Sequence, residues 1–438
     1  MSTRNSYRGG ENFDLRQMLL CGRRLKLKEK TSMFSAFLDD LAAHNHFTQM
    51  RCIASAADRE VTVLDSRTGE PKQMLMFGSN SYLGIANHPY VKERVHQAIR
   101  EYGVGIGGPP LLNGYTKLHR ELEERLAALK GAEDVMIFPA GYSANVGLVT
   151  GLVNETDMVL YDIYSHASFC DGMKMAGVGS AHFPHNNISR LKALLEAHGN
   201  EVDHELFVGV EGVYSMDGDL APLDDIVPLC RAHNALLIVD DAHGTGVMGE
   251  HGRGTAEHFG LEGQINITMG TFSKTFSATG GFVAASKPII NYLRFFARSY
   301  MFSASLPPPV IATVLGGLDV MEREPERLRQ LWDIVNYAQS ALGELGFAFR
   351  SESPILPLIV PVGMDLREAA RRFHDAGLFV NSIEYPAVPI SQQRFRVSLM
   401  ATHTKGDIDR LVNTVGEIWS SLAPRARHDD AAVQSEAA

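Results

Sequence analysis

Short apolar runs alternate with helix-length stretches from about Met76 to residue 318, and this alternation constrains the fold more than any other feature. The apolar runs are VMIF, MVLYD, LFVGVEG, ALLIVDD, INITMG and GGFVAA, which begin at residues 135, 158, 206, 235, 265 and 280. Helical patterns accompany them, for example Val91 to Tyr102 and Lys117 to Leu129. The alternation predicts an α/β fold with a mostly parallel sheet covered by helices on both faces. In such sheets, ligands bind at the carboxyl ends of the strands.

A smaller α/β domain is expected after this large one, because 438 residues exceed one simple core. Its predicted elements are a helix from Glu326 to Leu345, the strand ILPLIVPV, a helix from Leu366 to Ala376, the strand RFRVSLM and a last helix in GDIDRLVNTVGEIWSSL. We therefore divide the chain into an N-terminal arm (1–75), a large domain (76–318), a small C-terminal domain (319–424) and a disordered tail (425–438).

The arm combines positive charge with an amphipathic pattern. Basic residues alternate with leucines, and apolar residues at helical spacing follow: Arg23, Arg24, Lys26, Lys28 and Lys30, then Phe34, Phe37, Leu38 and Leu41. This pattern is typical of a helix packed on the main body, and also of a helix that contacts a membrane surface or an acidic partner.

Composition and charge limit the compartment and the partners. The net charge of −10 argues against a general nucleic-acid binder, which needs a basic surface. The four cysteines form no CxxC pair, and the chain has neither a signal-peptide-like apolar run nor a stretch of about 18 apolar residues. We expect a cytoplasmic protein without a metal site, either free of membranes or peripheral to the inner membrane face.

The stretch GTFSKTFSATGG contains the first candidate for chemistry, Lys274. An amine that is shielded from water and close to other positive charge has a lowered pKa and can form a Schiff base with a carbonyl. The hydroxyls of Thr271 and Ser273 just before it suit a phosphate. Most lysines beside serine or threonine are exposed, so this motif alone also fits an ordinary surface lysine.

The run LLIVDDAHGTG ends a predicted buried strand in Asp240, Asp241 and His243. An acidic residue there can keep a pyridine nitrogen protonated, which makes a pyridoxal ring an electron sink, and His243 could bond the phenolic oxygen of that ring. An aspartate that caps the next turn is the equally common alternative.

Three further motifs follow predicted strands. PAGYSANVGL opens a helix, where Gly141 and Tyr142 could hold a phosphate at the helix N-terminus. YDIYSHASFCDG carries His166, which could stack on a flat ring or be a plain buried histidine. EGVYSMDGDLAPL carries Ser215, a possible donor to a ring oxygen. Each motif is common, and only their combination is informative.

The order and spacing of these motifs resemble the fold type I pyridoxal 5′-phosphate (PLP) enzymes, and within them the α-oxoamine synthase family. The resemblance runs from FGSNSYLG near residue 77 to THTKGDIDRL near residue 402. The motifs SHASFCDG, EGVYSMDGDLAPL, GTFSKTF, GGFVAAS and FSASLPP are most similar to the bacterial serine palmitoyltransferases of that family. They are also similar to the 8-amino-7-oxononanoate synthases and the 2-amino-3-ketobutyrate CoA ligases.

The resemblance implies a role for each candidate residue. Lys274 would hold PLP as a Schiff base, Asp240 would pair with the pyridine nitrogen, and His243 would contact the phenolic oxygen. His166 would stack on the ring, and Arg396, assisted by Asn80, would bind the substrate carboxylate. The phosphate would be bound by Gly141, Tyr142 and Thr271, and by Ser303 and Ala304 of a neighbouring subunit. The resemblance therefore implies a homodimer with shared active sites.

Two departures from the family pattern stand out. The stretch GIGGPPLLNGYTKLH has Pro109 and Pro110 where a serine and an arginine are common, which puts any role of that arginine in binding the acyl donor in doubt. Asp241 and Gly244 replace a usual glutamate and a usual serine after the pyridine-binding aspartate, and we expect both changes to be tolerated.

The implied activity is the condensation of a small amino acid with an acyl-CoA thioester, with release of CoA and carbon dioxide. Serine is the first expectation, glycine and alanine are alternatives, and an acyl carrier protein could replace CoA. Other activities compatible with the motifs are those of an 8-amino-7-oxononanoate synthase, a glycine C-acetyltransferase or a PLP aminotransferase of the same fold. A non-catalytic partner subunit is disfavoured, because it would not need Lys274, Asp240 and His243.

Overall fold

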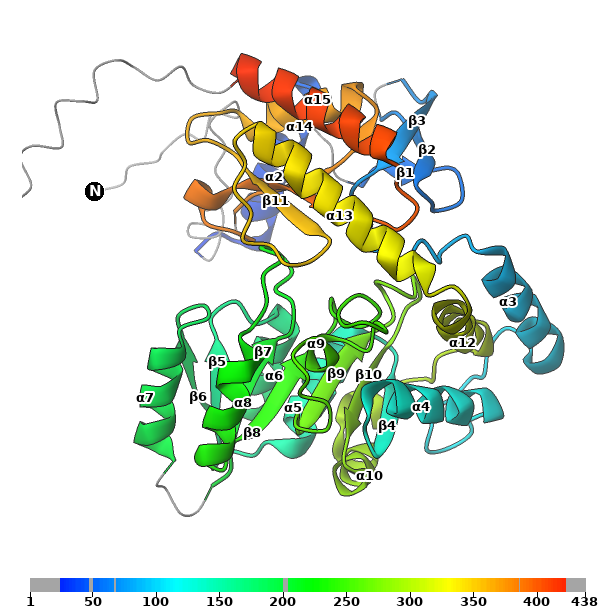
Figure 1. Ribbon diagram of the computed structural model, residues 1–438, viewed down its shortest axis with the longest axis vertical. Coiled ribbons are helices and arrows are strands. Elements are labelled where there is room, and N and C mark those ends of the chain that lie inside the picture. Colours follow the sequence, from blue (N-terminus) through cyan, green and yellow to red (C-terminus); the bar gives the residue numbers. More distant parts are fainter. Residues whose placement is uncertain (1–23, 47–49, 67, 200–203, 386, 423–438) are drawn as a thin grey trace, which may run out of the picture.

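The structure is a computed structural model that describes residues 24–46, 50–66, 68–199, 204–385 and 387–422 (Figure 1). Residues 1–23 and the predicted tail at 425–438 lie outside the described residues. Most of the described chain forms two α/β parts, a large sheet with its helices in the lower half of Figure 1 and the C-terminal elements above it.

The large sheet has seven strands in the order β4-β10-β9-β8-β7-β5-β6. Strands β5 to β9 are mutually parallel, and β10 runs antiparallel to both of its neighbours. The six apolar runs predicted as strands are all present, and β6 is an additional, largely exposed edge strand that its sequence did not indicate. The bounds are Asp134–Phe138 (β4), Met158–Asp162 (β5), Gly179–Phe183 (β6), Leu206–Glu211 (β7), Leu236–Asp240 (β8), Ile267–Thr271 (β9) and Gly281–Ala285 (β10).

Helices cover both faces of this sheet, as alternate residues along one strand show. In β5, Val159 packs with one set of helices and Leu160 with another, because successive side chains of a strand point to opposite faces. The helices are α3 (Pro89–Tyr102), α4 (Lys117–Lys130), α5 (Gly141–Leu152), α6 (Ala167–Ala176), α7 (Ile188–His198), α8 (Leu223–Ala232), α9 (Thr255–His258), α10 (Lys287–Phe296), α11 (Arg298–Met301) and α12 (Pro308–Arg323). The predicted α/β fold, with a mostly parallel sheet covered by helices on both faces, is thus confirmed.

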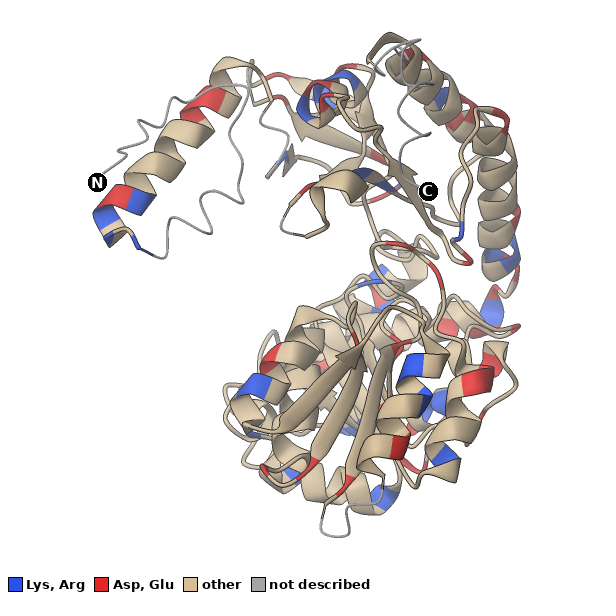
Figure 2. Cartoon of the chain, turned by 90° about the vertical axis from the view of Figure 1, so that its left-hand side faces the viewer, with Lys and Arg blue, Asp and Glu red and all other residues tan. Residues whose placement is uncertain are grey.

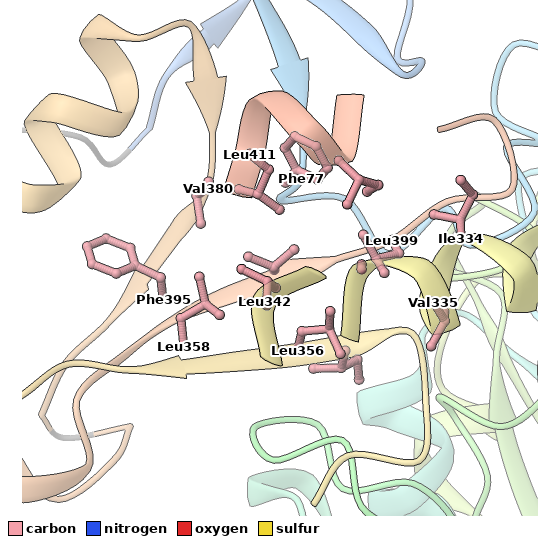
Figure 3. Packing of buried hydrophobic residues seen from close by; sticks show 14 of the residues in the cluster. Phe77, Ile334, Val335, Leu342, Leu356, Leu358, Val380, Phe395, Leu399 and Leu411 are labelled. Carbon is pink, nitrogen blue, oxygen red and sulfur yellow. The ribbon is translucent and has the colours of Figure 1, made fainter. Parts of the chain in front are cut away.

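The C-terminal part packs two long helices against a three-stranded sheet of order β11-β14-β13. Figure 3 shows its core, in which Leu342 of one helix meets Leu356 and Leu358 of β11, and Phe395 of β14 lies close by. The elements are α13 (Glu326–Glu344), β11 (Ile355–Ile359), α14 (Leu366–Asp375), β12 (Leu378–Phe379), β13 (Asn381–Ile383), a 3-10 turn (Ile390–Gln392), β14 (Arg394–Ser398) and α15 (Lys405–Leu422).

Strands also form within the stretch expected to be an arm. β1 (Cys52–Ile53), β2 (Glu60–Leu64) and β3 (Pro71–Met76) join β12 in a four-stranded sheet, so this stretch is folded together with the C-terminal part. Before them, α2 (Leu27–Ala43) buries Phe37 and Leu41, and the Arg367 guanidinium of α14 lies over the Phe37 ring. Figure 2 shows the basic start of α2 projecting away from the remaining elements.

Candidate active site

The predicted functional residues gather at the carboxyl edge of the large sheet. Asp240 is the last residue of β8 and Thr271 the last residue of β9. The loop that carries Lys274 follows β9 directly, and the loop that carries Ser215 follows β7. Because β7, β8 and β9 are parallel neighbours in the sheet, the loops that follow them lie side by side. Residues far apart in the sequence therefore share one site.

Lys274 is partly buried, and its amine donates no hydrogen bond to any residue that the structure describes. Burial lowers the pKa of this amine, and the Arg396 guanidinium acts in the same direction. The carboxyls of Asp240 and Glu211 oppose both effects. An amine with a lowered pKa is deprotonated more often near neutral pH, and the deprotonated form attacks carbonyls.

Asp240 is held in place by hydrogen bonds at both carboxyl oxygens. Its Oδ2 accepts from the Asn145 amide at 2.7 Å, and its Oδ1 accepts from the backbone N–H of Ala242 at 3.1 Å. The same Asn145 amide donates to the Ser168 hydroxyl at 2.9 Å, and this hydroxyl lies 2.7 Å from Nδ1 of His166. One hydrogen-bond chain therefore connects two of the predicted site residues, Asp240 and His166.

His243 is buried, and its Nδ1 lies 2.7 Å from the Tyr82 hydroxyl. Burial lowers the pKa of His243 well below its ordinary value, and the cationic side chains of Lys274 and Arg396 lower it further. The imidazole is therefore neutral at physiological pH and can hydrogen-bond an oxygen without carrying charge. Tyr82 was not predicted, although it lies in the same SNSYLG motif as Asn80.

Gly141 begins α5 and lies against Thr271. A Cβ atom on Gly141 would come within 2.8 Å of Thr271 Oγ1, and a Cβ on Gly281 would come within 2.7 Å of the Gly141 Cα. Thr271 Oγ1 lies 3.0 Å from the Ser273 hydroxyl and donates to the Gly280 carbonyl at 2.9 Å. Free helix N–H groups next to hydroxyls form a typical phosphate site. Tyr142 is half-exposed, and its hydroxyl bonds Asp171 on α6.

Arg396 is buried on β14 and connects three segments. Its Nε donates to the Ser215 carbonyl at 2.6 Å, and its Nη1 donates to Asn80 Oδ1 and to the Ser398 hydroxyl, both at 2.8 Å. Two residues earlier on the same strand face, Arg394 forms an ion pair with Asp217 at 2.6 Å. Both arginines therefore connect the C-terminal sheet with the loop that carries Ser215.

Ser303 and Ala304 lie apart from this cluster, in the loop between α11 and α12. They line one small pocket together with Pro110, and the neighbouring Ser305 donates its backbone N–H to the Gly108 carbonyl at 3.0 Å. The Pro109 carbonyl accepts from the N–H groups of Leu112 and Gly114. The two prolines thus stiffen a turn that supports the Ser303 loop, which gives this departure from the family pattern a physical role.

The second departure, Asp241 and Gly244, has a steric explanation. Asp241 forms a buried ion pair with Lys130 at 2.7 Å and accepts from the Thr255 hydroxyl at 2.8 Å. A Cβ atom on Gly244 would lie 2.1 Å from Asp241 Oδ1, so a side chain there collides with the carboxylate. The Asp241 carboxylate therefore occupies the space that a side chain at position 244 would need, and the two residues depend on each other.

Comparison with known proteins identifies the family. The model for "Aminotransferase class I and II" matches residues 72–415. The chain belongs to this family. It is 39% identical over 395 residues to serine palmitoyltransferase of Sphingobacterium spiritivorum, covering 90% of this chain and 97% of that protein. It is 38% identical over 392 residues to 8-amino-7-oxononanoate synthase of Geotalea daltonii, covering 89% of this chain and 98% of that protein.

A solved structure of serine palmitoyltransferase with its PLP internal aldimine is similar as well, with a TM-score of 0.83 and 30% identity. The alignment covers 91% of this chain and 99% of that one. The chain is thus an α-oxoamine synthase, a PLP-dependent enzyme. Its own residues fit the cofactor: a partly buried amine without a hydrogen-bond partner in the described chain, a fixed carboxylate, and a helix N-terminus beside hydroxyls.

The described residues contain no group of three or more histidine, cysteine and acidic side chains that could hold a metal ion. Among the described helices, none combines the length and the apolar character that crossing a bilayer requires.

Proposed function

We propose that the enzyme condenses serine with a long-chain acyl thioester, releasing the thiol and carbon dioxide and leaving an α-amino ketone. The observation that carries this proposal is the placement of Arg396. A buried guanidinium, held by Asn80 and the Ser215 loop, lies near enough to Lys274 to lower the pKa of its amine. Such a group binds the carboxylate of an amino acid while the amine of Lys274 is nearby.

The residues divide the chemical work in this proposal. PLP, when bound, supplies an electron sink for the substrate α-carbon. Lys274 Nζ takes the proton from that carbon, His243 hydrogen-bonds as a neutral group, and Asp240 would pair with the pyridine nitrogen of the cofactor. The α-carbon then forms a bond to the acyl carbon, and the thiolate leaves and takes a proton from water. The bond to the substrate carboxyl breaks with loss of carbon dioxide, and the ammonium of Lys274 returns its proton to the α-carbon.

The proposed assembly is a homodimer in the cytoplasm. Ala304 is exposed and the neighbouring Phe302 is 70% exposed, so this loop is available to a second subunit. We propose that Ser303 and Ala304 complete the phosphate site of that subunit, and that the basic start of α2 contacts an anionic membrane surface, where a long-chain acyl donor is concentrated.

Thiol release from acyl-CoA tests the activity. Purified enzyme is combined with serine, glycine or alanine, each with short and long acyl chains, and the Lys274→Ala variant is the control. We expect release that depends on serine and a long chain, and we expect Lys274→Ala to lose both turnover and the visible absorbance of bound PLP. Release with another amino acid would contradict the choice of serine, and turnover by Lys274→Ala would contradict the role of the lysine.

A second candidate is the formation of 8-amino-7-oxononanoate, because the Geotalea daltonii relative is almost as similar as the Sphingobacterium spiritivorum one. Release that requires alanine would favour it. An absorbance change with amino acids but no release from any thioester would point to a carrier-protein donor or to an aminotransferase.

A further inference from the structure

Glu211 lies beside Asp240 at the carboxyl edge of the large sheet. Each is the last residue of its strand, and the register of the parallel strands β7 and β8 pairs them directly. Paired residues of adjacent strands point to the same face of a sheet, so the two carboxyls are neighbours. Only 4% of Glu211 and 8% of Asp240 are exposed.

The two carboxyls are surrounded by different numbers of donors. Asp240 accepts at both oxygens, from Asn145 and from the backbone of Ala242. Glu211 Oε2 accepts only a long bond of 3.3 Å from the backbone N–H of Ser215, and its buried Oε1 has no partner among the described residues. A buried carboxylate requires donors to compensate for lost water, and Glu211 has too few.

The charges around Glu211 also disfavour its ionised form. Burial raises the pKa of Glu211 well above its ordinary value, and the carboxyls of Asp240 and Asp162 raise it further. The amine of Lys274 acts in the opposite direction, but its own pKa is lowered by burial. Burial and the neighbouring carboxyls therefore favour the protonated form of Glu211, whereas each oxygen of Asp240 has a hydrogen-bond donor.

We propose that Glu211 is protonated in the folded enzyme and donates a hydrogen bond from Oε1 into the PLP pocket, beside the carboxyl of Asp240, which accepts hydrogen bonds at both oxygens. Glu211 is a positioning residue in this proposal, because it orients the cofactor without exchanging a proton with the substrate. The inference rests on the PLP site and not on the proposed substrates, so its tests contain neither amino acid nor thioester.

The first test measures the melting temperature of cofactor-free protein against pH, with Glu211→Gln as the variant. A carboxyl that stays protonated on folding costs stability as the pH rises above its unfolded pKa, whereas glutamine has the same shape and does not titrate. We expect the advantage of Glu211→Gln over the wild type to grow by about 3 °C between pH 6 and pH 8.5. Glu196→Gln, on the exposed side of α7, is the matched control and should show no growing advantage.

The second test measures the equilibrium dissociation constant of PLP from its absorbance and fluorescence. Glutamine retains a donor, so Glu211→Gln should bind PLP within about threefold of the wild type. Methionine fills the space without a donor, and Glu211→Met should bind about tenfold more weakly. A pH-independent difference in melting temperature would show that Glu211 is ionised and would overturn the proposal. So would equal losses in both variants, or wild-type binding by Glu211→Met.

Discussion

Replacing Gly141 by alanine should weaken PLP binding although it changes no charge and adds one methyl group. The new Cβ would lie 2.8 Å from Thr271 Oγ1 and 3.0 Å from Thr271 Cβ, and something must then move. Thr271 cannot move freely, because it ends the mostly buried strand β9 and its hydroxyl donates to the Gly280 carbonyl. The start of α5 therefore shifts, and the helix N–H groups lose their alignment with the phosphate.

The size of this effect follows from the cost of overpacking. Forcing an extra methyl group into a packed site costs about 1–3 kcal/mol, and 1.4 kcal/mol corresponds to a tenfold change in affinity. We expect the dissociation constant of PLP, measured by absorbance of the reconstituted protein, to rise by about 10- to 100-fold. The control is Gly343→Ala in α13, where a Cβ would meet nothing within 4 Å. Unchanged PLP affinity in Gly141→Ala would refute the placement of the phosphate beside this glycine.

Three further predictions concern buried polar groups. Lys130→Met should lower stability by about 3–5 kcal/mol in chemical unfolding, because it leaves a buried carboxylate unpaired. The control is Lys174→Met, which removes an exposed ion pair and should lower stability by less than about 1 kcal/mol. Equal losses of stability in Lys130→Met and Lys174→Met would contradict the argument. His185 bridges two aspartates, which raise its pKa to about 9, so the stability it contributes should be complete below pH 6.5 and disappear as the pH rises through 9. His185→Gln should flatten that part of the plot of melting temperature against pH. An unchanged plot would show that His185 is not the group responsible for this pH dependence. Tyr82→Phe should shift the absorbance of bound PLP, because His243 loses its hydrogen bond to the Tyr82 hydroxyl. An unchanged spectrum would show that His243 does not contact the cofactor.

The large sheet and the residues at its strand ends could be predicted from the sequence because both depend on local patterns. Runs such as VMIF and ALLIVDD are apolar over the length of one strand, and β4 and β8 occupy them. Once parallel strands are inferred, residues at or just after their carboxyl ends, such as Asp240 and Lys274, must meet at one edge. The roles given to these residues stay predictions until variants are measured.

Residues whose importance comes from pairing between segments could not be found in this way. Glu211 was included in an apolar run, and only the register of β7 against β8 brings it beside Asp240. Asn145 is a polar residue in the second turn of α5, and its contact with Asp240 depends on how this helix packs on the sheet. The strands between residues 52 and 76 pair locally with each other, and only the pairing of β3 with β12 joins them to the C-terminal part. That last pairing joins segments about 300 residues apart, so the sequence pattern of the arm did not indicate that the arm belongs to this sheet.

The contact between Asp241 and Gly244 also restricts how this sequence could have diverged. The family resemblance implies glutamate and serine at these positions. If serine were combined with the present Asp241, the serine Cβ would lie only 2.1 Å from Asp241 Oδ1. This oxygen belongs to the carboxylate that forms the buried ion pair with Lys130. A side chain at position 244 therefore requires the Asp241 carboxylate to move first, so in the present protein a change to serine at 244 would have to follow a change at position 241.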